Sequence, residues 1–478
     1  MAVLENLEPK SVFGFFEEMA SIPHGSGNTK QVSDWLVSFA KERNLEYYQD
    51  SLNNVIIIKE ATPGYENGEP IILQGHMDMV CEQAPDCTKD MTKEGLDLGI
   101  DGDMVYAKGT TLGGDDGIAD AMMMAILDAE DIPHPRVECV FTVDEETGMY
   151  GAIAIDCSPL KARRFLNIDS EDEGVFTVSC AGGNITRCTL PLVRAPFEGS
   201  ALTITVDGLQ GGHSGIEINK GRANSNMTMG RILAAIAKVT GLRLISVAGG
   251  QKDNAIPNCT VAKVMVADAE AVKTVCAQFD ADLKAEYVIT DHDIRVSVEA
   301  GEAAEAMDAA STDKAICMLT CLPNGIQVMS ADIEGLVQTS LNLGVLTTDE
   351  TEIVASFCVR SSVETQKAMV VDRIKVLMKQ LGGKVEVQGD YLGWAYCQES
   401  PLRDLLVEVF KDQYGKEPKV EAIHAGVECG MFVGKIPGLD CVSIGPDLRN
   451  VHTFNERMYI GSVQRTWKLL LETLKRMK

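Results

Sequence analysis

The chain has 478 residues, of which 45% are hydrophobic and 24% are charged, as in ordinary globular proteins of two or three domains. Acidic side chains outnumber basic ones by 70 to 43, so the formal net charge is −27. This balance argues against nucleic-acid and anionic-membrane partners, because both recruit basic surfaces.

The first 180 residues alternate apolar strands with helical stretches. Helices are expected within residues 10–44, broken by a turn at 22–28, and again at 118–130. Strands are expected at 55–59, 71–75, 137–143 and 165–168. This alternation predicts an α/β fold, with a mostly parallel sheet flanked by helices.

The pattern changes near residues 191–196, after which strands and helices follow an α+β order. Strands are expected at 201–207, 242–248, 260–267 and 293–299, and helices at 224–240 and 269–285. A similar order recurs between about 326 and 387. We therefore expect an inserted α+β lid domain made of two similar units in tandem.

The α/β pattern resumes after residue 396, with a helix at 401–414, a strand at 441–444 and a last helix from 462. Residues 1–186 and 398–478 are predicted to form one discontinuous catalytic domain, with residues 187–397 inserted into it. The main reason for joining the two ends is His452, which completes the ligand set described next.

No targeting or membrane segment is expected. The amino terminus lacks a basic start followed by an apolar run, and no window approaches 18 apolar residues. The 14 cysteines are scattered without a Cys-x-x-Cys pair, which favours a reducing compartment. These features predict a cytoplasmic protein.

Five metal-type ligands each follow a short apolar run: His76, Asp115, Glu146, Asp169 and His452. Ligands of open α/β sheets bind outside the carboxyl ends of the strands, so these side chains are expected to converge. Histidine and carboxylate donors suit Zn²⁺ most, with Co²⁺ and Mn²⁺ as alternatives. The pattern predicts a two-metal hydrolase.

The ligands divide naturally around one shared carboxylate. His76 with Asp169, and Glu146 with His452, are expected to hold one ion each, with Asp115 bridging them. Asp116 is the rival for the bridging position, because spacing alone does not separate the two aspartates. Two divalent ions would be neutralised by three carboxylates and one bridging hydroxide, the expected nucleophile.

Two further acids have predicted roles. Asp78 lies two residues after His76, on the same face of an extended backbone, and is expected to orient the imidazole. Glu145, next to Glu146, is the expected general base, which takes a proton from the attacking water and passes it to the leaving amine.

The motifs QGHMDMV (74–80), GTTLGGDDG (109–117) and TVDEETG (142–148) resemble those of the dinuclear zinc peptidases related to carboxypeptidase G. Supporting stretches are SIPHGSGN (21–28), GGHSG (211–215), HAGVECG (424–430) and SIGP (443–446). The resemblance runs nearly end to end. It implies the zinc-peptidase fold, two metal ions and the ligand, orienter and base roles given above.

The resemblance also implies that lid residues contact the substrate. His213 would donate a hydrogen bond to the developing oxyanion, and Arg360 and Gly426 would bind the terminal carboxylate. The implied activity is hydrolysis of short unblocked dipeptides, including Xaa-His substrates such as β-alanyl-histidine. An N-acyl amino acid deacylase or a tripeptidase is the alternative, and the chain is expected to be a monomer or a homodimer.

Overall fold

The computed structural model describes residues 2–478, which divide into two compact units. Unit 1 is built from the chain up to Ser179, from Tyr396–Ala422 and from Val427–Lys478. Unit 2 is built from Cys180–Ala395 and Ile423–Gly426. The domains expected from the sequence, residues 1–186 with 398–478 and residues 187–397, stay a prediction.

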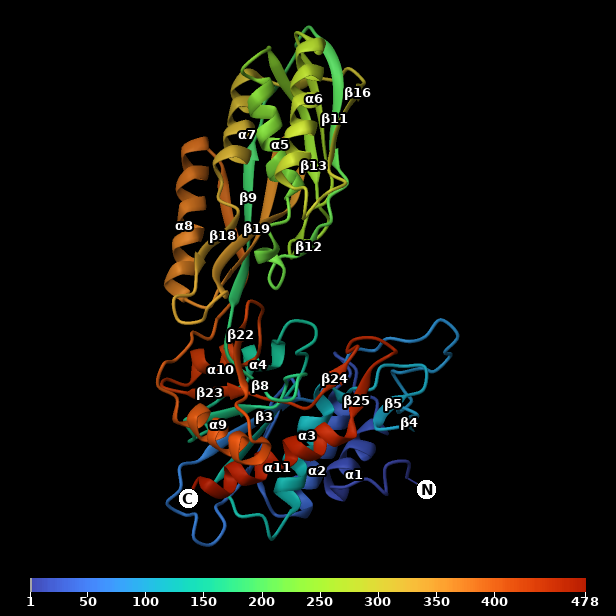
Figure 1. The fold of residues 1–478 in the computed structure, drawn as a ribbon, viewed down its shortest axis with the longest axis vertical. Coiled ribbons are helices and arrows are strands. Elements are labelled where there is room, and N and C mark those ends of the chain that lie inside the picture. The colour runs from blue at the N-terminus through green and yellow to red at the C-terminus, as the bar shows by residue number, and fades with distance from the viewer. Residues whose placement is uncertain (1) are drawn as a thin grey trace. The chain divides into compact units, whose positions relative to one another are not determined.

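Unit 1 contains an eight-stranded sheet of order β1-β2-β6-β3-β7-β23-β8-β22 (Figure 1). Its strands are β1 (Glu46–Gln49), β2 (Val55–Lys59), β3 (Ile71–His76), β6 (Val137–Thr142), β7 (Arg164–Asn167), β8 (Val175–Cys180), β22 (Lys419–Ile423) and β23 (Asp440–Ser443). The central strands β6, β3, β7 and β23 run parallel. Every residue of β3 and β6 is buried, as expected for parallel strands covered on both faces.

The helices of unit 1 are α1 (Lys10–Ala20), α2 (Lys30–Glu42), α3 (Gly114–Asp128), α4 (Tyr150–Ala154), α9 (Pro401–Tyr414), α10 (Cys429–Lys435) and α11 (Ile460–Arg476). All of them except the short α4 and α10 contribute buried residues to one apolar core that they share with the sheet. Helix α3 is buried along nearly its whole length, which explains its apolar residues on all sides. The predicted mostly parallel sheet flanked by helices is confirmed.

A four-stranded antiparallel sheet of order β24-β25-β5-β4 completes unit 1. It joins β4 (Leu98–Asp101) and β5 (Met104–Ala107) to β24 (Leu448–Arg449) and β25 (Arg457–Tyr459). Two segments about 350 residues apart in the sequence are thereby held together. The loop between β24 and β25 carries His452.

Unit 2 contains one nine-stranded sheet of order β16-β11-β15-β13-β19-β20-β9-β21, with β18 paired to β19 (Figure 1). Its strands are β9 (Gly182–Pro191), β11 (Ser200–Asp207), β13 (Leu242–Gly249), β15 (Thr260–Val266), β16 (Arg295–Ala300), β18 (Gly325–Met329), β19 (Val337–Thr348), β20 (Glu352–Ser361) and β21 (Lys384–Tyr391). Its helices are α5 (Ser225–Ile236), α6 (Ala269–Glu286), α7 (Ala309–Cys321) and α8 (Glu364–Leu381). Antiparallel pairing runs throughout.

Two βαββαβ modules form this sheet and meet where β13 pairs with β19. One is β11-α5-β13-β15-α6-β16, and the other is β9-α7-β19-β20-α8-β21. The first module is nested between β9 and α7 of the second. Two similar units are thus present, but their order is nested and not tandem, because β9 precedes the first module in the chain and pairs with β20 and β21 of the second.

Within residues 2–478, every helix is too short or too polar to cross a bilayer.

Candidate metal centre and functional site

All five predicted ligands lie in unit 1, at one edge of its sheet. His76 is the last residue of β3, Asp169 follows β7, and Glu146 follows β6. Asp115 lies in the first turn of α3, and His452 lies between β24 and β25. Because β6, β3 and β7 are parallel neighbours, their carboxyl ends meet, and the ligands converge there.

The carboxylate of Asp115 lies between the two histidines. Its Oδ1 is 3.2 Å from Nε2 of His76, and its Oδ2 is 3.1 Å from Nε2 of His452. Each histidine has a second carboxylate: Oδ1 of Asp169 is 3.5 Å from His76 Nε2, and Oε2 of Glu146 is 2.9 Å from His452 Nε2. The structure brings together the pairs that the sequence suggested.

The donor set fits divalent cations. Two overlapping groups have ligand atoms within 4.8 Å of one another, namely His76 with Asp115 and Glu146, and His76 with Asp116 and Asp169. Oε1 of Glu146 is buried and has no hydrogen-bond partner among residues 2–478. An unpaired buried carboxylate oxygen beside imidazoles is what a cation would satisfy.

Asp115 and Asp116 have different surroundings. Asp115 directs one oxygen to each histidine, as a bridging ligand would. Oδ2 of Asp116 accepts a hydrogen bond from the backbone N–H of His76 at 3.3 Å, and burial followed by the charge of Asp169 raises its pKa well above the usual value. The geometry favours Asp115 over its neighbour for the shared position.

Proton affinities in the cluster show how strongly it attracts positive charge. Hydrogen bonds to Asp115 and Glu146 raise the pKa of His452 to about 11. Burial would lower the pKa of His76, but its carboxylate partners raise it well above the usual value. Burial raises the pKa of Asp169 to about 6. A bound cation would displace these protons, so metal binding should depend on pH.

Asp78 and Glu145 lie beside the ligands as predicted from their spacing. Nδ1 of His76 is 3.0 Å from the backbone carbonyl oxygen of Asp78 and 3.5 Å from its carboxylate. Asp78 also accepts hydrogen bonds from Ser26 Oγ at 2.8 Å and from the backbone N–H of Glu145 at 3.1 Å. Asp78 thus links the His76 ring to the segment that carries the predicted base.

The pKa of the Glu145 carboxyl is raised well above its usual value, first by burial and also by the neighbouring acids Asp169, Glu428 and Glu146. A raised pKa makes a carboxylate a stronger proton acceptor. The environment therefore suits Glu145 to the role of a base.

The buried acids of unit 1 that the sequence reasoning missed include Glu456 and Glu428. Glu456 accepts hydrogen bonds from four consecutive backbone N–H groups, those of residues 112–115, at 2.7–3.3 Å. Glu428 accepts from Gln74 Nε2 at 2.5 Å and from Thr142 Oγ1 at 2.7 Å, beneath the end of β3. Glu428 lay inside the HAGVECG motif, whereas no local signal distinguished Glu456.

His213 belongs to unit 2, in the short strand β12 (Gly212–His213). Its Nδ1 accepts hydrogen bonds from the backbone N–H groups of Gly215 and Ile216, both at 3.2 Å. Burial and then the charge of Arg360 lower the pKa of the ring. A neutral ring whose Nδ1 is an acceptor carries its proton on Nε2, which leaves Nε2–H as a donor.

Arg360 also lies in unit 2, where it is 93% buried on β20. Its Nη1 donates to Tyr391 Oη at 3.3 Å, and its Nε is buried with no hydrogen-bond partner among the described residues. No carboxylate of residues 2–478 pairs with it. A surface salt bridge, the ordinary role of such a side chain, is therefore excluded, and the guanidinium retains capacity for an anion.

Gly215 fixes how closely the polar groups of unit 2 approach one another. A Cβ atom at this position would lie 2.5 Å from the carbonyl oxygen of His424, 2.9 Å from Cε1 of His213 and 3.2 Å from Nε of Arg360. His424, which the sequence reasoning quoted without a role, donates or accepts at Nε2 with Ser340 Oγ at 2.7 Å. Glycine is required here because any side chain would separate these groups.

Gly426 closes the segment Ile423–Gly426 that belongs to unit 2. The backbone N–H of Ala181 is shared between the carbonyl oxygens of Ile423 at 3.2 Å and Ala425 at 3.0 Å. These bonds anchor the segment beside β9. His213, Arg360 and Gly426 thus occur in one unit, and the five predicted ligands with Glu145 and Asp78 occur in the other.

The chain is similar to known peptidases along its whole length. It is 37% identical over 480 residues to the cytosol non-specific dipeptidase of Escherichia coli K12, covering 99% of each chain. It superposes on the crystal structure of aminoacylhistidine dipeptidase from Vibrio alginolyticus with a TM-score of 0.95 and 34% identity, covering 99% of this chain and 98% of that one. The aminopeptidase PepT structure from Bacillus cereus matches with a TM-score of 0.55 at 16% identity, which shows a shared fold alone.

A family model extends over the segments that carry every predicted ligand. It matches residues 72–476, from the strand that ends at His76 to the last helix. The resemblance inferred from the sequence motifs is thereby confirmed. Because the family model matches most of the chain, including the strand ends that carry the ligands, the chain belongs to peptidase family M20/M25/M40.

Proposed function

We propose that the protein is a metal-dependent dipeptidase that hydrolyses short unblocked dipeptides, including Xaa-His substrates such as β-alanyl-histidine. The observation that carries the proposal is the Asp115 carboxylate between His76 and His452, each with a second carboxylate of its own. Two relatives that are more than 30% identical over nearly their whole length are dipeptidases by name. The alternative, an N-acyl amino acid deacylase or a tripeptidase, is not favoured by them.

Two divalent ions, for which the histidine and carboxylate donors suit Zn²⁺, would share Asp115. One would be held with His76 and Asp169, and the other with His452 and Glu146. When bound, the ions supply Lewis acidity toward the scissile carbonyl and the attacking water. Asp78 holds the His76 ring in the orientation that a ligand needs.

The protein's own side chains and backbone carry out proton transfer, hydrogen bonding to the oxyanion and substrate binding. Glu145 accepts the proton of the attacking water and delivers it to the leaving amine. Nε2–H of His213 donates to the carbonyl oxygen as negative charge develops on it. Arg360 and the backbone at Gly426 bind the terminal carboxylate, since a guanidinium with a free donor suits a carboxylate. The enzyme would act in the cytoplasm as a monomer or homodimer.

The proposal is tested by histidine release from β-alanyl-histidine. Metal-stripped protein should be inactive, and activity should return on addition of Zn²⁺ and saturate near two equivalents. Full occupancy of two ions without histidine release would contradict the substrate class and leave the metal site intact.

The role of Glu145 as the base is tested by Glu145→Gln, which keeps the shape of the side chain and removes its basicity. It should retain both ions and lose kcat by about 10²–10⁴-fold, the range for a general base. Retention of most of the activity would remove Glu145 from the role of base.

A further inference from the structure

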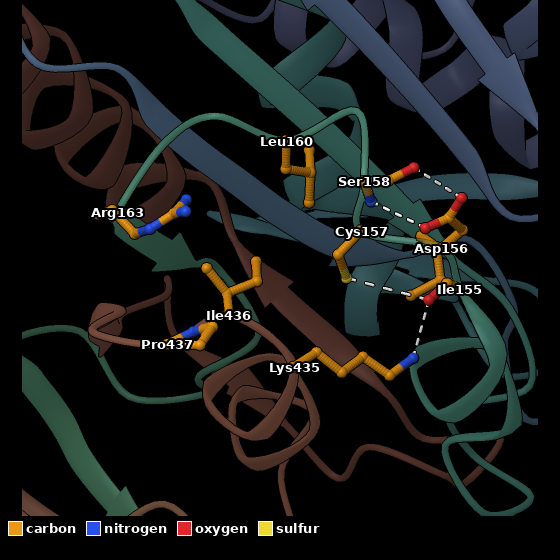
Figure 2. Close-up of a pocket in the computed structure, with 9 residues that line it drawn as sticks. All are labelled: Ile155, Asp156, Cys157, Ser158, Leu160, Arg163, Lys435, Ile436 and Pro437. Carbon is orange, nitrogen blue, oxygen red and sulfur yellow. Dashed lines mark hydrogen bonds between the residues drawn. The ribbon is translucent and has the colours of Figure 1, made fainter.

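A pocket of unit 1, of about 510 Å³, lies at the opposite end of the sheet from the predicted ligands. Its walls come from the segment that follows α4 and leads into β7, and from the segment that joins α10 to β23 (Figure 2). Both segments enter the amino ends of their strands, whereas the ligands follow carboxyl ends. The pocket has no part in the proposed dipeptidase site.

Two nucleophilic side chains meet at one carbonyl of this pocket. Nζ of Lys435 donates to the carbonyl oxygen of Ile155 at 2.9 Å, and the thiol of Cys157 approaches the same oxygen at 4.0 Å. Figure 2 shows the sulfur and the amine converging on this oxygen from different elements. Both side chains are partly exposed, so a reagent in the pocket reaches both.

The surroundings adjust the proton affinities of both groups. Burial lowers the pKa of Lys435 from its usual value, so a larger fraction of its amine is free of a proton at neutral pH. Burial raises the pKa of Cys157, an effect that the positive charge of Lys435 partly offsets. The thiol therefore needs a base to become a nucleophile, and the neighbouring amine is one.

We propose that Cys157 and Lys435 form an acylation site, at which the Cys157 thiol takes an acyl group from a thioester and passes it to the Lys435 amine. In the first step the sulfur attacks the thioester carbonyl, the amine accepts the thiol proton, and the carrier leaves as a thiolate, which takes a proton from solvent. After the ammonium loses its proton to solvent, the amine attacks the Cys157 thioester. An amide forms on Lys435, and the Cys157 thiol is regenerated.

The lining of the pocket defines the class of acyl donor. Ile155, Leu160, Ile436 and Pro437 provide apolar surface for a short aliphatic acyl chain. Arg163, which lines the same pocket as the acid Asp156, donates through Nη1 to two backbone carbonyls and forms no ion pair among residues 2–478, so its charge can attract an anion. An anionic carrier of a short acyl thioester fits these features.

The test is mass-spectrometric quantification of lysine acetylation on the full chain incubated with acetyl-coenzyme A at pH 8. Lys435 should be acetylated at least about tenfold faster than the exposed Lys416 of the same unit, because the thiol and amine act intramolecularly. Cys157→Ser should reduce the acetylation rate of Lys435 to that of Lys416. Lys435→Arg removes both the base and the acceptor, so acetylation of Cys157 should be slower, and the hydroxylamine-sensitive acetyl group that does form there should persist.

Two controls separate transfer through the thiol from simple accessibility. Cys259→Ser, at an exposed cysteine of unit 2, should leave the acetylation of Lys435 unchanged. An N-hydroxysuccinimide acetate ester needs no thiol and should label Lys435 equally in the wild type and in Cys157→Ser, which also shows that the variant is folded. Equal thioester-driven labelling in both proteins, or labelling no faster than Lys416, would overturn the proposal.

Discussion

A single carboxylate, that of Asp115, connects the two halves of the candidate metal centre. Its two oxygens lie 3.2 and 3.1 Å from the imidazoles of His76 and His452. Burial would raise the pKa of this carboxyl, but hydrogen bonds with His452 and His76 outweigh burial and hold it below the usual value. Since both histidines depend on one side chain, the two cation positions are expected to form or fail together.

Replacing the two adjacent aspartates in turn tests this dependence. Asp115→Asn should lose both tightly bound ions, because an amide cannot supply two anionic oxygens to two cations. Asp116→Asn should keep two ions, because the amide oxygen can still accept from the backbone N–H of His76. The two variants are distinguished by their metal content after gel filtration, measured by elemental mass spectrometry. The reverse result would identify Asp116 as the shared ligand.

The first turn of α3 depends on a side chain from the other end of the chain. The carboxylate of Glu456, only 2% exposed, accepts from the backbone N–H groups of residues 112–115. Helix N-termini attract negative charge because their first N–H groups lack partners. Glu456 thereby fixes the backbone from which Asp115 projects.

We expect Glu456→Ala to lower the free energy of unfolding by about 3 kcal/mol, because buried N–H groups lose their acceptor. It should also weaken metal binding, since the Asp115 backbone is no longer held. Glu456→Gln keeps one acceptor oxygen and should show less than half of each effect. Urea unfolding and zinc titration measure the two quantities. A Glu456→Ala protein with unchanged metal affinity would show that α3 positions Asp115 without this cap.

The segment Ile423–Gly426 depends on a histidine that is held neutral. His424 is 6% exposed, and burial followed by the charges of Arg360 and His213 lowers its pKa to about 3. In the unfolded chain a histidine titrates near pH 6.5. Because the folded pKa is the lower one, the unfolded state binds the proton first, and stability falls as the pH drops below about 6.5.

Between pH 7 and pH 4 this linkage amounts to a loss of about 3 kcal/mol in the free energy of unfolding. His424→Gln, which keeps a partner for Ser340, should therefore lose about 3 kcal/mol less than the wild type over that range. Urea unfolding of metal-stripped protein at both pH values measures the difference, and stripping removes the contribution of metal release. His292→Gln, at an exposed histidine, should behave as the wild type. If the free energy of unfolding fell as much in His424→Gln as in the wild type, His424 would not be the titrating group.

The features that could be predicted from sequence are local ones. Each ligand followed an apolar run, so the ends of β3, β6 and β7 were recognisable without a structure. Pairings between distant segments were not: β9 completes a module whose other strands begin at residue 337, and Glu456 bonds to residues more than 340 positions earlier. Such contacts leave no periodicity in the sequence, and the nested order of unit 2 was missed for this reason.

Metal binding should also stabilise the folded chain, because the cluster places three carboxylates together in a protein of net charge −27. A ligand that binds only the folded state stabilises it by about 2.7 kcal/mol at 100 times its Kd, so two ions would contribute about 5 kcal/mol. Chelation should lower Tm by several degrees in calorimetry, and two equivalents of Zn²⁺ should restore it. Asp115→Asn provides the control, since it should respond to neither treatment. An equal shift in that variant would place the stabilising ions elsewhere in the molecule.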